Sequence, residues 1–470
     1  MIFEIRKFKN TKNRMGAEIM GLPKKGFSYF VILLMAVLVV GCSNSSGGKG
    51  SDKKEVEAEV TTVGPEDGAK LDMWLFVDLH QKFYTEMLNK WNETNPDKQI
   101  QIKFTVYPYA DMHTKLTLSV QSGEGIPDLA DVEIGQFPNY LDGEVPWLAL
   151  NSYVEPYKAD LVTSRLDAYE KDGNYYGVPT HVGATVMYYN TEILEKHGID
   201  YTKIKTWDDF AAAGEKLKEA TNGEVYMTSV DTGGADWLTL AMSEHGESWV
   251  KDPSNANVKL DSLNNMLTMQ QGWLESGIAE VTPGGQIDTE QGYATVAKGE
   301  VAAFPKAIWY MSRFTDYMPE MSGKFAIAPA PVFEEGQKRS NGAGGTGTVV
   351  YKDSENAELA AEFMTWAKLT EEGGEQIWNI LGFDPVNTKV WTNKDITHNP
   401  DNEYVKYFVN NPFDTLLEIQ DEVNLIKTVP ITTTINEVFN LTTLNEVLEN
   451  GANVKQALED AQAEVDFEQE

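Results

Sequence analysis

The chain of 470 residues contains one cysteine, Cys42, which directly follows an apolar run at residues 29–40. Lys24 and Lys25 lie just before this run. A basic segment, a short apolar stretch and small residues before a cleavage point are the pattern of a secretory signal peptide. The run is also far shorter than the ~20 residues of a membrane-spanning helix. Residues 1–41 are therefore predicted to be a leader, and the exported part has no second thiol with which to form a disulfide.

The residues Val39, Val40, Gly41 and Cys42 resemble the lipobox of bacterial lipoproteins. The resemblance implies cleavage before Cys42, attachment of a diacylglycerol with palmitate-type chains to its thiol, and acylation of the new amino terminus. Two or more acyl chains anchor a protein stably, where one chain does not. We therefore expect an extracytoplasmic protein, lipid-anchored to the cell membrane, at a Gram-positive cell surface rather than in a periplasm. Met1, Met15 and Met20 remain alternative starts of the leader.

Residues 43–68 consist mainly of Ser, Gly, Lys, Glu and Thr. Such a segment buries too little apolar surface to offset the chain entropy lost on folding. We expect a flexible linker over residues 42–69 that holds a folded part off the membrane. The same polarity argues against a buried helix with a chance cysteine as the alternative for the apolar run. About 400 residues remain, more than the roughly 250–300 at which single cores stop growing, so two lobes are expected.

Charge and metal-ligand spacing exclude several classes of partner. The chain has a formal net charge of −33 at pH 7, and removing the basic leader makes it more negative. Such a surface repels nucleic acid and anionic lipid. The six histidines are scattered, without the i, i+4 spacing of zinc motifs. We therefore expect no nucleic acid partner, no metal and no other cofactor.

Helical and strand-like hydrophobic patterns alternate along the first part of the exported chain. The expected strands are residues 71–76, 100–107, 129–134 and, further on, 182–189. The expected helices are residues 80–92, 111–121 and 207–220, the last capped by Thr206 with Asp209, and residues 172–179 suggest a hairpin. Strands and helices in this order indicate an α/β fold with a parallel sheet and right-handed crossovers.

In such sheets, ligands bind outside the carboxyl ends of the strands. His80 and Asp111 follow two of the expected strands, and Glu133 ends the third. These residues are therefore candidates for a binding edge. A surface histidine is the alternative for His80, as it is for His181 near another strand end, and a surface or helix-capping carboxylate is the alternative for Glu133.

Five groups of residues, in order along the exported chain, resemble the extracellular solute-binding proteins of the maltose-binding-protein-like, carbohydrate-uptake class. The first group comprises residues 173–179, 188–190 and 205–210, and the second is residues 291–303. The third comprises residues 329–331, 344–347 and 360–364. The fourth is residues 382–387, and the fifth is residues 454–461. No single match is specific, so the resemblance depends on their order behind a lipobox. Within this class, residues 74–80, 108–113 and 131–135 look most like receptors for arabinose-containing oligosaccharides.

The resemblance implies the two-lobe, type II periplasmic-binding-protein-like fold, with a ligand cleft between lobes joined by crossing hinge strands. Carried onto this chain, lobe 1 takes residues 70–181 and 328–382, and lobe 2 takes residues 182–327 and 383–470. The family's members capture a carbohydrate by hinge closure and deliver it to the permease of an ABC importer. We therefore expect a monomeric receptor, not an enzyme.

A site for sugars needs flat aromatic rings for C–H faces and polar side chains for the hydroxyls. Trp237 follows a Gly-rich bend, and Trp309 lies where family members place a stacking tryptophan. The candidate ligand-binding residues are His80, Asp111, Glu133, His181, Trp237, Trp309, Gly345, Phe383 and Asp384. Because they come from separate segments on both lobes, we predict an oligosaccharide of two or more units. Core packing is the alternative for both tryptophans, and the expected packing tryptophans are Trp91, Trp249, Trp273, Trp366 and Trp378.

Other functions remain as alternatives. The same fold could hold a metal complex, a polyamine or a phosphate ester. A ferric site would use clustered tyrosines, but Tyr188 and Tyr189 are adjacent and should point to opposite faces of a strand. A secreted glycoside-acting enzyme would need two carboxylates at a fixed separation, and the sequence identifies no such pair. Whether the receptor also feeds a sensor kinase stays open.

Overall fold

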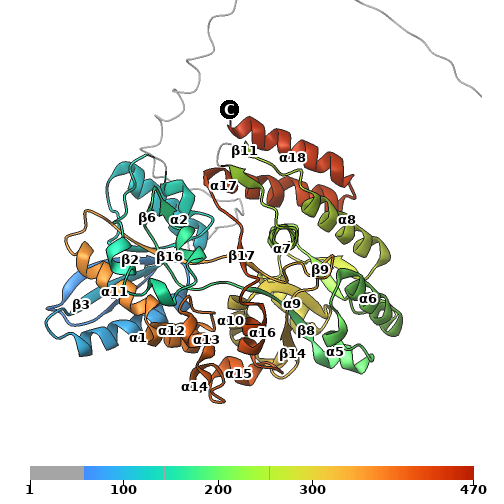
Figure 1. The fold of residues 1–470 in the computed structure, drawn as a ribbon, viewed down its shortest axis with the longest axis horizontal. Coiled ribbons are helices and arrows are strands. Elements are labelled where there is room, and N and C mark those ends of the chain that lie inside the picture. The colour runs from blue at the N-terminus through green and yellow to red at the C-terminus, as the bar shows by residue number, and fades with distance from the viewer. Residues whose placement is uncertain (1–57, 142, 253–254, 470) are drawn as a thin grey trace, which may run out of the picture. The chain divides into compact units, whose positions relative to one another are not determined.

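The computed structural model describes residues 58–469 except 142, 253 and 254 (Figure 1). The predicted signal peptide, the lipidation site Cys42 and the linker up to residue 57 lie outside the described residues. Two lobes, each with its own sheet, confirm the predicted α/β fold. In the part of the chain that is described, no helix combines the length and the hydropathy that crossing a bilayer requires.

Lobe 1 is built on a six-stranded sheet in the order β1-β3-β2-β4-β16-β7. Its strands are β1 (Glu59–Val63), β2 (Ala69–Leu75), β3 (Ile100–Val106), β4 (Leu129–Glu133), β7 (Val178–Pro179) and β16 (Thr346–Val350). Strand β2 pairs in parallel with both β3 and β4, as predicted from the alternation of strands and helices. Strand β1 is antiparallel to β3, and β16 is antiparallel to β4 and β7.

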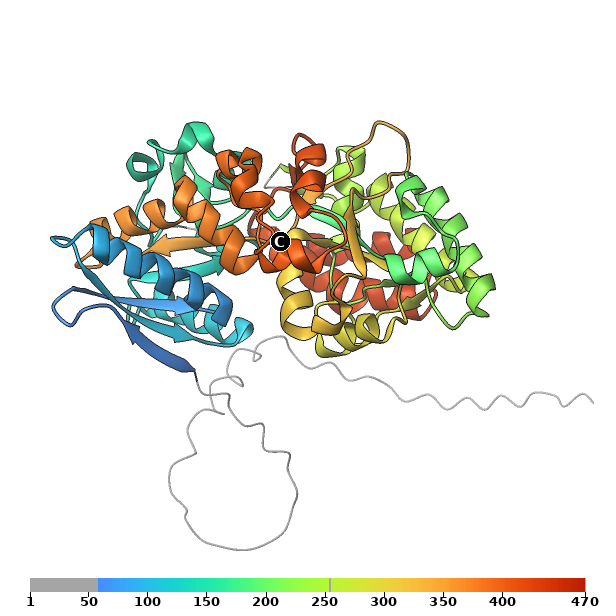
Figure 2. The ribbon, with the colours of Figure 1, turned by 90° about the horizontal axis from the view of Figure 1, so that it is seen from below.

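Helices cover both faces of this sheet because its strands carry apolar side chains on both. Leu71, Met73 and Leu75 face one core with α1 (Asp78–Thr94) and α11 (Ala357–Leu369). The intervening Trp74 packs instead on the core beneath α2 (Tyr109–Ser122). Figure 2 shows α1 and α11 along one face of the sheet. The remaining helices of lobe 1 are α3 (Asn151–Val154), α4 (Ser164–Asp167), α12 (Glu371–Gln376), α13 (Thr388–Thr392) and α14 (Lys394–Thr397).

Lobe 2 has an antiparallel sheet in the order β13-β8-β14 and a parallel pair, β9 and β12. Its strands are β8 (Thr185–Asn190), β9 (Thr228–Val230), β12 (Ala279–Val281), β13 (Ala303–Ala307) and β14 (Phe325–Ala328). Its longer helices are α6 (Trp207–Thr221), α7 (Asp236–His245), α8 (Asp261–Ser276), α9 (Glu290–Lys298), α16 (Pro412–Ile419), α17 (Pro430–Val438) and α18 (Val454–Gln469). Tyr188 and Tyr189 on β8 join different cores, so their predicted opposite orientations are confirmed.

Shorter elements complete the fold. The strands are β5 (Glu170–Lys171), β6 (Asn174–Tyr175), β10 (Val250–Asp252), β11 (Asn255–Ala256), β15 (Asn341–Gly342) and β17 (Asn424–Leu425). The helices are α5 (Thr191–Lys196), α10 (Met311–Tyr317) and α15 (Glu403–Tyr407). The 3-10 segments are Phe137–Tyr140, Lys158–Asp160, Tyr201–Lys203, Ile308–Tyr310 and Pro319–Met321, and the π-helical segments are Ile377–Leu381, Phe439–Thr443 and Asn445–Glu449.

Two local predictions are confirmed. The pair β5 and β6 forms the expected hairpin around Asp172. At the start of α6, the Thr206 hydroxyl accepts from the Asp209 amide at 3.1 Å, and the Asp209 carboxylate accepts from the Thr206 amide at 3.0 Å. This reciprocal pair satisfies two backbone donors that the helix itself leaves free.

The predicted linker, residues 42–69, extends too far along the chain. Strand β1 (Glu59–Val63) lies within that range and pairs antiparallel with β3. Polar composition suggested disorder, but an edge strand tolerates polar residues because one of its faces meets water. Val63 packs on the lobe 1 core, so lobe 1 begins at β1.

The predicted boundaries of the lobes also need correction. Residues 329–340 were expected to return to lobe 1, yet Ala330 lies in the lobe 2 core and Val332 O accepts from Trp207 N at 3.0 Å. Residues 383–392 were expected in lobe 2, yet Val386 O accepts from Val162 N at 2.9 Å on lobe 1. In both places the buried apolar residues, rather than the motif that marks a crossover, decide which lobe holds the segment.

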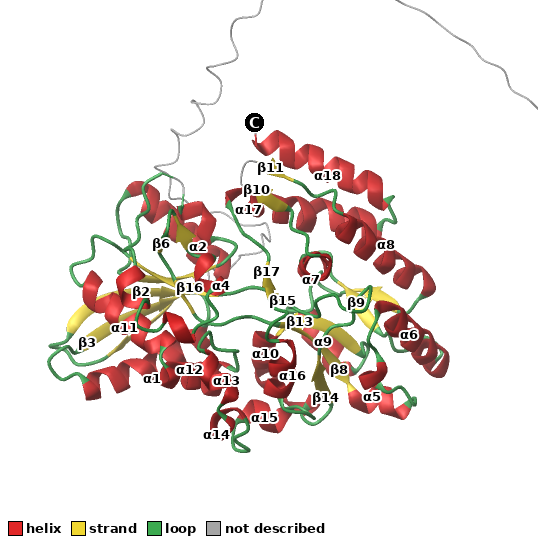
Figure 3. Ribbon diagram, in the orientation of Figure 1, coloured by secondary structure: helices red, strands yellow, loops and turns green. Residues whose placement is uncertain are grey.

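The chain crosses between lobes along segments that hydrogen-bond one another. Ala184 pairs with Gly342, and Val182 N donates to Asp384 O at 2.9 Å. The Asp384 carboxylate accepts from Gly183 N at 2.9 Å and from Ala184 N at 2.8 Å. Strand β15 of this hinge pairs in parallel with β17, and Figure 3 shows the two between the sheets of the lobes.

Candidate ligand-binding cleft

Both lobes line a central cavity of about 370 Å³ next to the hinge. Lobe 1 contributes residues that follow β2 and β3 and the last residue of β4, lobe 2 contributes Asp288 and residues from and before α10, and the crossing segments contribute the rest. The lining residues are Phe76, Val77, His80, Tyr109, Glu133, His181, Asp288, Trp309, Arg313, Gly344, Gly345, Thr346 and Phe383.

Three further cavities adjoin the central one, because each shares lining residues with it. An outer cavity of about 580 Å³ shares Phe76, Val77, Asp288 and Arg313. A polar cavity of about 230 Å³ shares Glu133 and Gly344, and a side cavity of about 430 Å³ shares Glu133 and Tyr109. The space between the lobes is therefore an elongated cleft rather than a single compact pocket.

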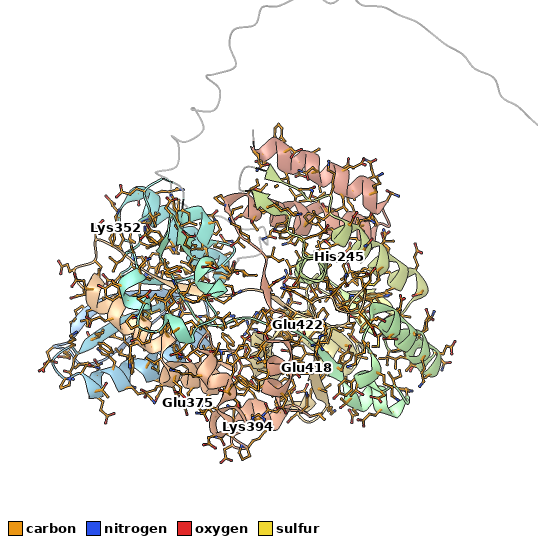
Figure 4. All side chains as sticks on the ribbon, viewed as in Figure 1. His245, Lys352, Glu375, Lys394, Glu418 and Glu422 are labelled. Carbon is orange, nitrogen blue, oxygen red and sulfur yellow. The ribbon has the colours of Figure 1, made fainter. Side chains whose placement is uncertain are left out.

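A larger cavity, of about 710 Å³, lies elsewhere, on lobe 2 between residues 327–339 and α16. Within its charged wall, the Arg339 guanidinium donates to Glu418 Oε1 at 2.5 Å and to Glu422 Oε2 at 3.0 Å. Figure 4 labels Glu418 and Glu422 side by side in this region. One lobe alone lines this cavity, so it does not resemble the cleft.

His80 forms part of the lobe 1 wall, on the first turn of α1. The side chain is buried, and its Nδ1 lies 2.9 Å from Asp131 Oδ2. The rings of Phe76 and Phe383 contact the imidazole edge-on, at centroid distances of 5.7 and 6.0 Å. These contacts fix the orientation of the ring at the cavity wall.

Glu133 ends β4 and faces the central, polar and side cavities. Its Oε2 accepts from Gly135 N at 2.7 Å and from the Tyr109 hydroxyl at 3.3 Å. Burial raises the pKa of Glu133 to about 7, although both hydrogen bonds oppose the shift. A carboxyl group with this pKa can donate as well as accept near neutral pH.

His181 lies on the hinge, and its ring centroid is 4.7 Å from that of Phe383. It is only 4% exposed, and neither ring nitrogen has a hydrogen-bond partner among the described residues. Burial, followed by the nearby Arg165 guanidinium, holds the pKa of His181 well below its usual range. A neutral imidazole at the cleft is thus left with one donor and one acceptor for a ligand.

Trp309 forms the lobe 2 wall and is half-buried. Its Nε1 donates to Ala343 O on the hinge at 3.1 Å. The Arg313 guanidinium lies 5.5 Å from the indole centroid and donates to Asp288 Oδ1 at 3.1 Å. The indole is therefore held at the cavity by contacts from both the hinge and lobe 2.

The structure brings six of the nine predicted ligand-binding residues together. Those that line the central cavity are His80, Glu133, His181, Trp309, Gly345 and Phe383. Their contact with a ligand stays a prediction.

The other three predicted residues lie elsewhere. Trp237 is buried in the lobe 2 core against Trp207 and Trp273, at 5.6 and 5.7 Å between centroids. Asp111 is exposed on α2 and lines none of the four cleft cavities. Asp384 is fully buried in the hinge, where its carboxylate is occupied by two backbone amides. These three expectations are corrected. Trp237 packs in the lobe 2 core, Asp384 pairs with the hinge backbone, and Asp111 is exposed on the first turn of α2.

Sequence reasoning missed several lining residues. Phe76 and Tyr109 follow β2 and β3, so the rule about strand ends pointed to their segments but not to these rings. Asp288 and Arg313 had no local signal because they become neighbours only through folding. Trp249 packs in the lobe 2 core, as expected, but it precedes β10 rather than lying in a helix, and it also lines the polar cavity.

The charges of the cleft are mainly negative. Among the described residues that line the four cavities, the carboxylates are Glu59, Asp78, Glu133, Asp236, Asp288, Asp316 and Glu437, and the cationic side chains are Lys82 and Arg313. Arg313 is already paired with Asp288. The cleft is therefore unfavourable for an anionic ligand. No cluster of three potential metal ligands occurs in the described ranges.

Comparison with known proteins adds independent information. The family model of bacterial extracellular solute-binding proteins matches residues 78–374. An arabinooligosaccharide-binding protein of Halalkalibacterium halodurans is 40% identical over 416 residues, which cover 87% of this chain and 92% of that protein. An arabinooligosaccharide-binding protein of Bacillus subtilis is 38% identical over 453 residues, which cover 94% of this chain and 99% of that protein.

A solved structure shows the same fold. The ABC transporter associated binding protein from B. animalis subsp. lactis Bl-04, in complex with β-1,6-galactobiose, superposes with a TM-score of 0.71. It is 20% identical, and the match covers 86% of this chain and 98% of that one. The architecture is thus the two-lobe, type II fold.

We predict that Glu133→Gln stabilises the unliganded protein more at pH 8 than at pH 5. Burial raises the pKa of Glu133 from 4.5 to about 7, so ionising it costs folding free energy. That cost is absent below about pH 4.5 and complete above about pH 7, and glutamine never incurs it. Thermal unfolding of both proteins at the two pH values measures the difference.

Glu437→Gln is the matched control, since Glu437 is an exposed carboxylate of the same cleft. The other buried carboxyl groups are present in all the proteins compared, so their contributions to the pH dependence of stability cancel. If Glu133→Gln changed the unfolding temperature equally at both pH values, the buried-carboxyl interpretation would be wrong.

Proposed function

The chain belongs to the family of bacterial extracellular solute-binding proteins, and we propose that it captures an oligosaccharide of arabinose units in its cleft and delivers it to an ABC importer. The two relatives at 40% and 38% identity, which match nearly all of this chain, are arabinooligosaccharide-binding proteins. Their similarity supports arabinose as the repeating unit.

The observation that carries the proposal is the elongated cleft. Four cavities share walls between the lobes, so a ligand of several units can occupy neighbouring cavities at once. The central cavity combines the rings of Phe76, Tyr109, Trp309 and Phe383 with polar groups. Aromatic faces suit the C–H surface of a sugar, and polar groups suit its hydroxyls.

The polar cavity suits a further sugar unit. Three of its lining residues, Trp249, Thr428 and Asn440, carry a buried side-chain nitrogen or oxygen without a hydrogen-bond partner in the described part of the chain. Buried polar atoms of this kind are costly unless a partner arrives. A hydroxylated ligand supplies such partners.

The charge of the cleft distinguishes a saccharide from the other classes of ligand that this fold could bind. The excess of carboxylates disfavours phosphate esters and citrate complexes of iron. A polyamine is the second candidate, because the same carboxylates would attract a polycation. The aromatic rings and the neutral His181 favour a sugar over a polyamine.

Capture would proceed by closure of the lobes about the hinge. A ligand that contacts both walls binds the closed state more tightly than the open state and so shifts the population toward closure. The importer then receives the closed form. We propose a monomeric receptor without catalytic activity, in line with relatives that are binding proteins.

A panel of ligands tests the proposal on the protein that begins at Ser43. We expect arabino-oligosaccharides of two to six units to raise the unfolding temperature, and arabinose, glycerol phosphate and ferric citrate to leave it unchanged. A ligand at 100 times its Kd adds about 2.7 kcal/mol, which is several degrees for a chain of this size. A shift with spermidine and none with any sugar would support the second candidate. Recovery of the oligosaccharides intact after incubation would exclude hydrolysis.

We predict that Trp309→Ala weakens binding of the tightest arabino-oligosaccharide at least tenfold, because the indole is the largest ring in the central cavity. Calorimetric titration measures the change. Trp309→Phe is the matched variant: it keeps an aromatic face but loses the bond to Ala343 O. If Trp309→Ala left the affinity unchanged, or if its main effect were unfolding without ligand, Trp309 would have a packing role instead.

Anchoring is tested separately. Cys42 lies in the lipobox-like segment, and we propose that it carries the lipid that holds the receptor at the membrane. We predict that Cys42→Ser moves the protein from the membrane fraction to the medium or keeps it as an uncleaved precursor. Fractionation with labelled palmitate measures both. Equal membrane retention of a cleaved Cys42→Ser protein would contradict a lipid anchor.

A further inference from the structure

Beneath His80, a buried polar network fills part of the lobe 1 core. Its centre is Asp131 on β4, which is fully buried. Tyr84 OH and Thr348 Oγ1 each donate to Asp131 Oδ1 at 2.7 Å. The other carboxylate oxygen, Oδ2, lies 2.9 Å from His80 Nδ1. The two oxygens thus serve different partners.

Lys368 makes this carboxylate an anion. Its Nζ is fully buried, lies 4.0 Å from Asp131 Oδ1 and donates to Val178 O at 3.0 Å. Burial alone would raise the pKa of the Asp131 carboxyl, but the Lys368 ammonium and the bond with His80 hold that pKa below its usual value. An ionised carboxylate can only accept hydrogen bonds. Consequently His80 must be the donor, with its proton on Nδ1.

The same arrangement leaves His80 Nε2 without a proton and therefore available to a ligand in the cleft. A neutral imidazole that is protonated on Nδ1 presents a lone pair at Nε2. His80 lines the central cavity, and the rings of Phe76 and Phe383 both pack edge-on against it. The ring has one defined orientation, so its free nitrogen has a defined direction.

We propose that Asp131 is a positioning residue that fixes the tautomer of His80, so that His80 Nε2 accepts a hydrogen bond from one hydroxyl of the bound saccharide. This role rests on the proposed function. Asp131 itself touches no ligand and acts through His80. The saccharide must therefore present a hydroxyl donor at that position, and a sugar with a methoxy group or a hydrogen there loses this bond.

The network also explains why a carboxylate is required. In Asp131→Asn, the amide oxygen would face the two hydroxyl donors, Tyr84 and Thr348, and the amide nitrogen would face His80. The NH₂ group then donates to His80 Nδ1, which forces the proton of the imidazole onto Nε2. The hydroxyl of the saccharide would have to reverse the direction of its hydrogen bond.

The test combines histidine NMR with titration of arabinotriose. In the unaltered protein without ligand, ¹⁵N-resolved spectra should show His80 protonated on Nδ1, and in Asp131→Asn on Nε2. Calorimetry should show arabinotriose binding at least tenfold more weakly to Asp131→Asn. His80→Asn, which retains a group at the Nδ1 position and removes Nε2, should lose a similar factor.

A double-mutant cycle separates positioning from general damage. If Asp131 acts through His80, Asp131→Asn added to His80→Asn should weaken arabinotriose binding no further. Because Asp131→Asn leaves the Lys368 charge buried without its counterion, Asp131→Asn with Lys368→Met provides a neutral version should the single variant unfold. Thermal unfolding without ligand checks the fold of each variant.

The possible failures are distinguishable. Protonation of His80 on Nε2 in the unaltered protein, or additive losses in the cycle, would overturn the positioning role. Unchanged affinity of Asp131→Asn for arabinotriose would also overturn it, while the proposed function would stand. If the unaltered protein bound no arabino-oligosaccharide at all, the proposed function itself would fail, and this role with it.

Discussion

The pairing of the crossing segments at the hinge is the constraint on which the rest of the molecule depends. The Asp384 carboxylate accepts from two consecutive amides, those of Gly183 and Ala184. Gly183 has a φ of +71°, and a Cβ there would lie 2.6 Å from Ala343 O, so only glycine fits between the crossing segments. Each lobe is assembled from separate stretches of the chain, and this junction sets how those stretches meet. The contacts of Asp384 with Gly183 and Ala184 involve no side chain that lines the central cavity.

The hinge and the candidate site share residues, so the proposed binding would act directly on the proposed closure. His181 and Phe383 lie on crossing segments and line the central cavity. Trp309 belongs to lobe 2 but donates to Ala343 O on the hinge. A ligand that packs on these groups contacts the very segments about which the lobes rotate. Differential affinity for the closed state, which closure requires, can thus arise from direct contact with the hinge.

Sequence patterns predicted those site residues whose position depends on neighbours along the chain. They failed for residues whose position depends on packing between segments that are distant in the sequence. Strand ends pointed to His80 and Glu133, because β2 and β4 are parallel neighbours whose carboxyl ends meet at one edge. Trp237 and Trp249 show the limit: both are tryptophans near turns that pack in the lobe 2 core, yet Trp249 also lines the polar cavity. Nothing local distinguishes them. Asp288 was missed for the same reason, since its partner Arg313 reaches it only in the folded lobe.

The buried carboxyl groups near the cleft differ in a way that bears on the ligand. Asp131 stays ionised because Lys368 and His80 compensate for its burial, whereas burial raises the pKa of Glu133 to about 7. Glu133 thus exchanges readily between a donor and an acceptor near neutral pH. A hydroxylated, uncharged ligand can pair with either form, because a hydroxyl both donates and accepts. A polycation would instead pair only with the ionised form of Glu133, which is about half populated near pH 7. The wall can therefore pair with a neutral saccharide in either protonation state of Glu133, even though the formal charges of the cleft are mostly negative.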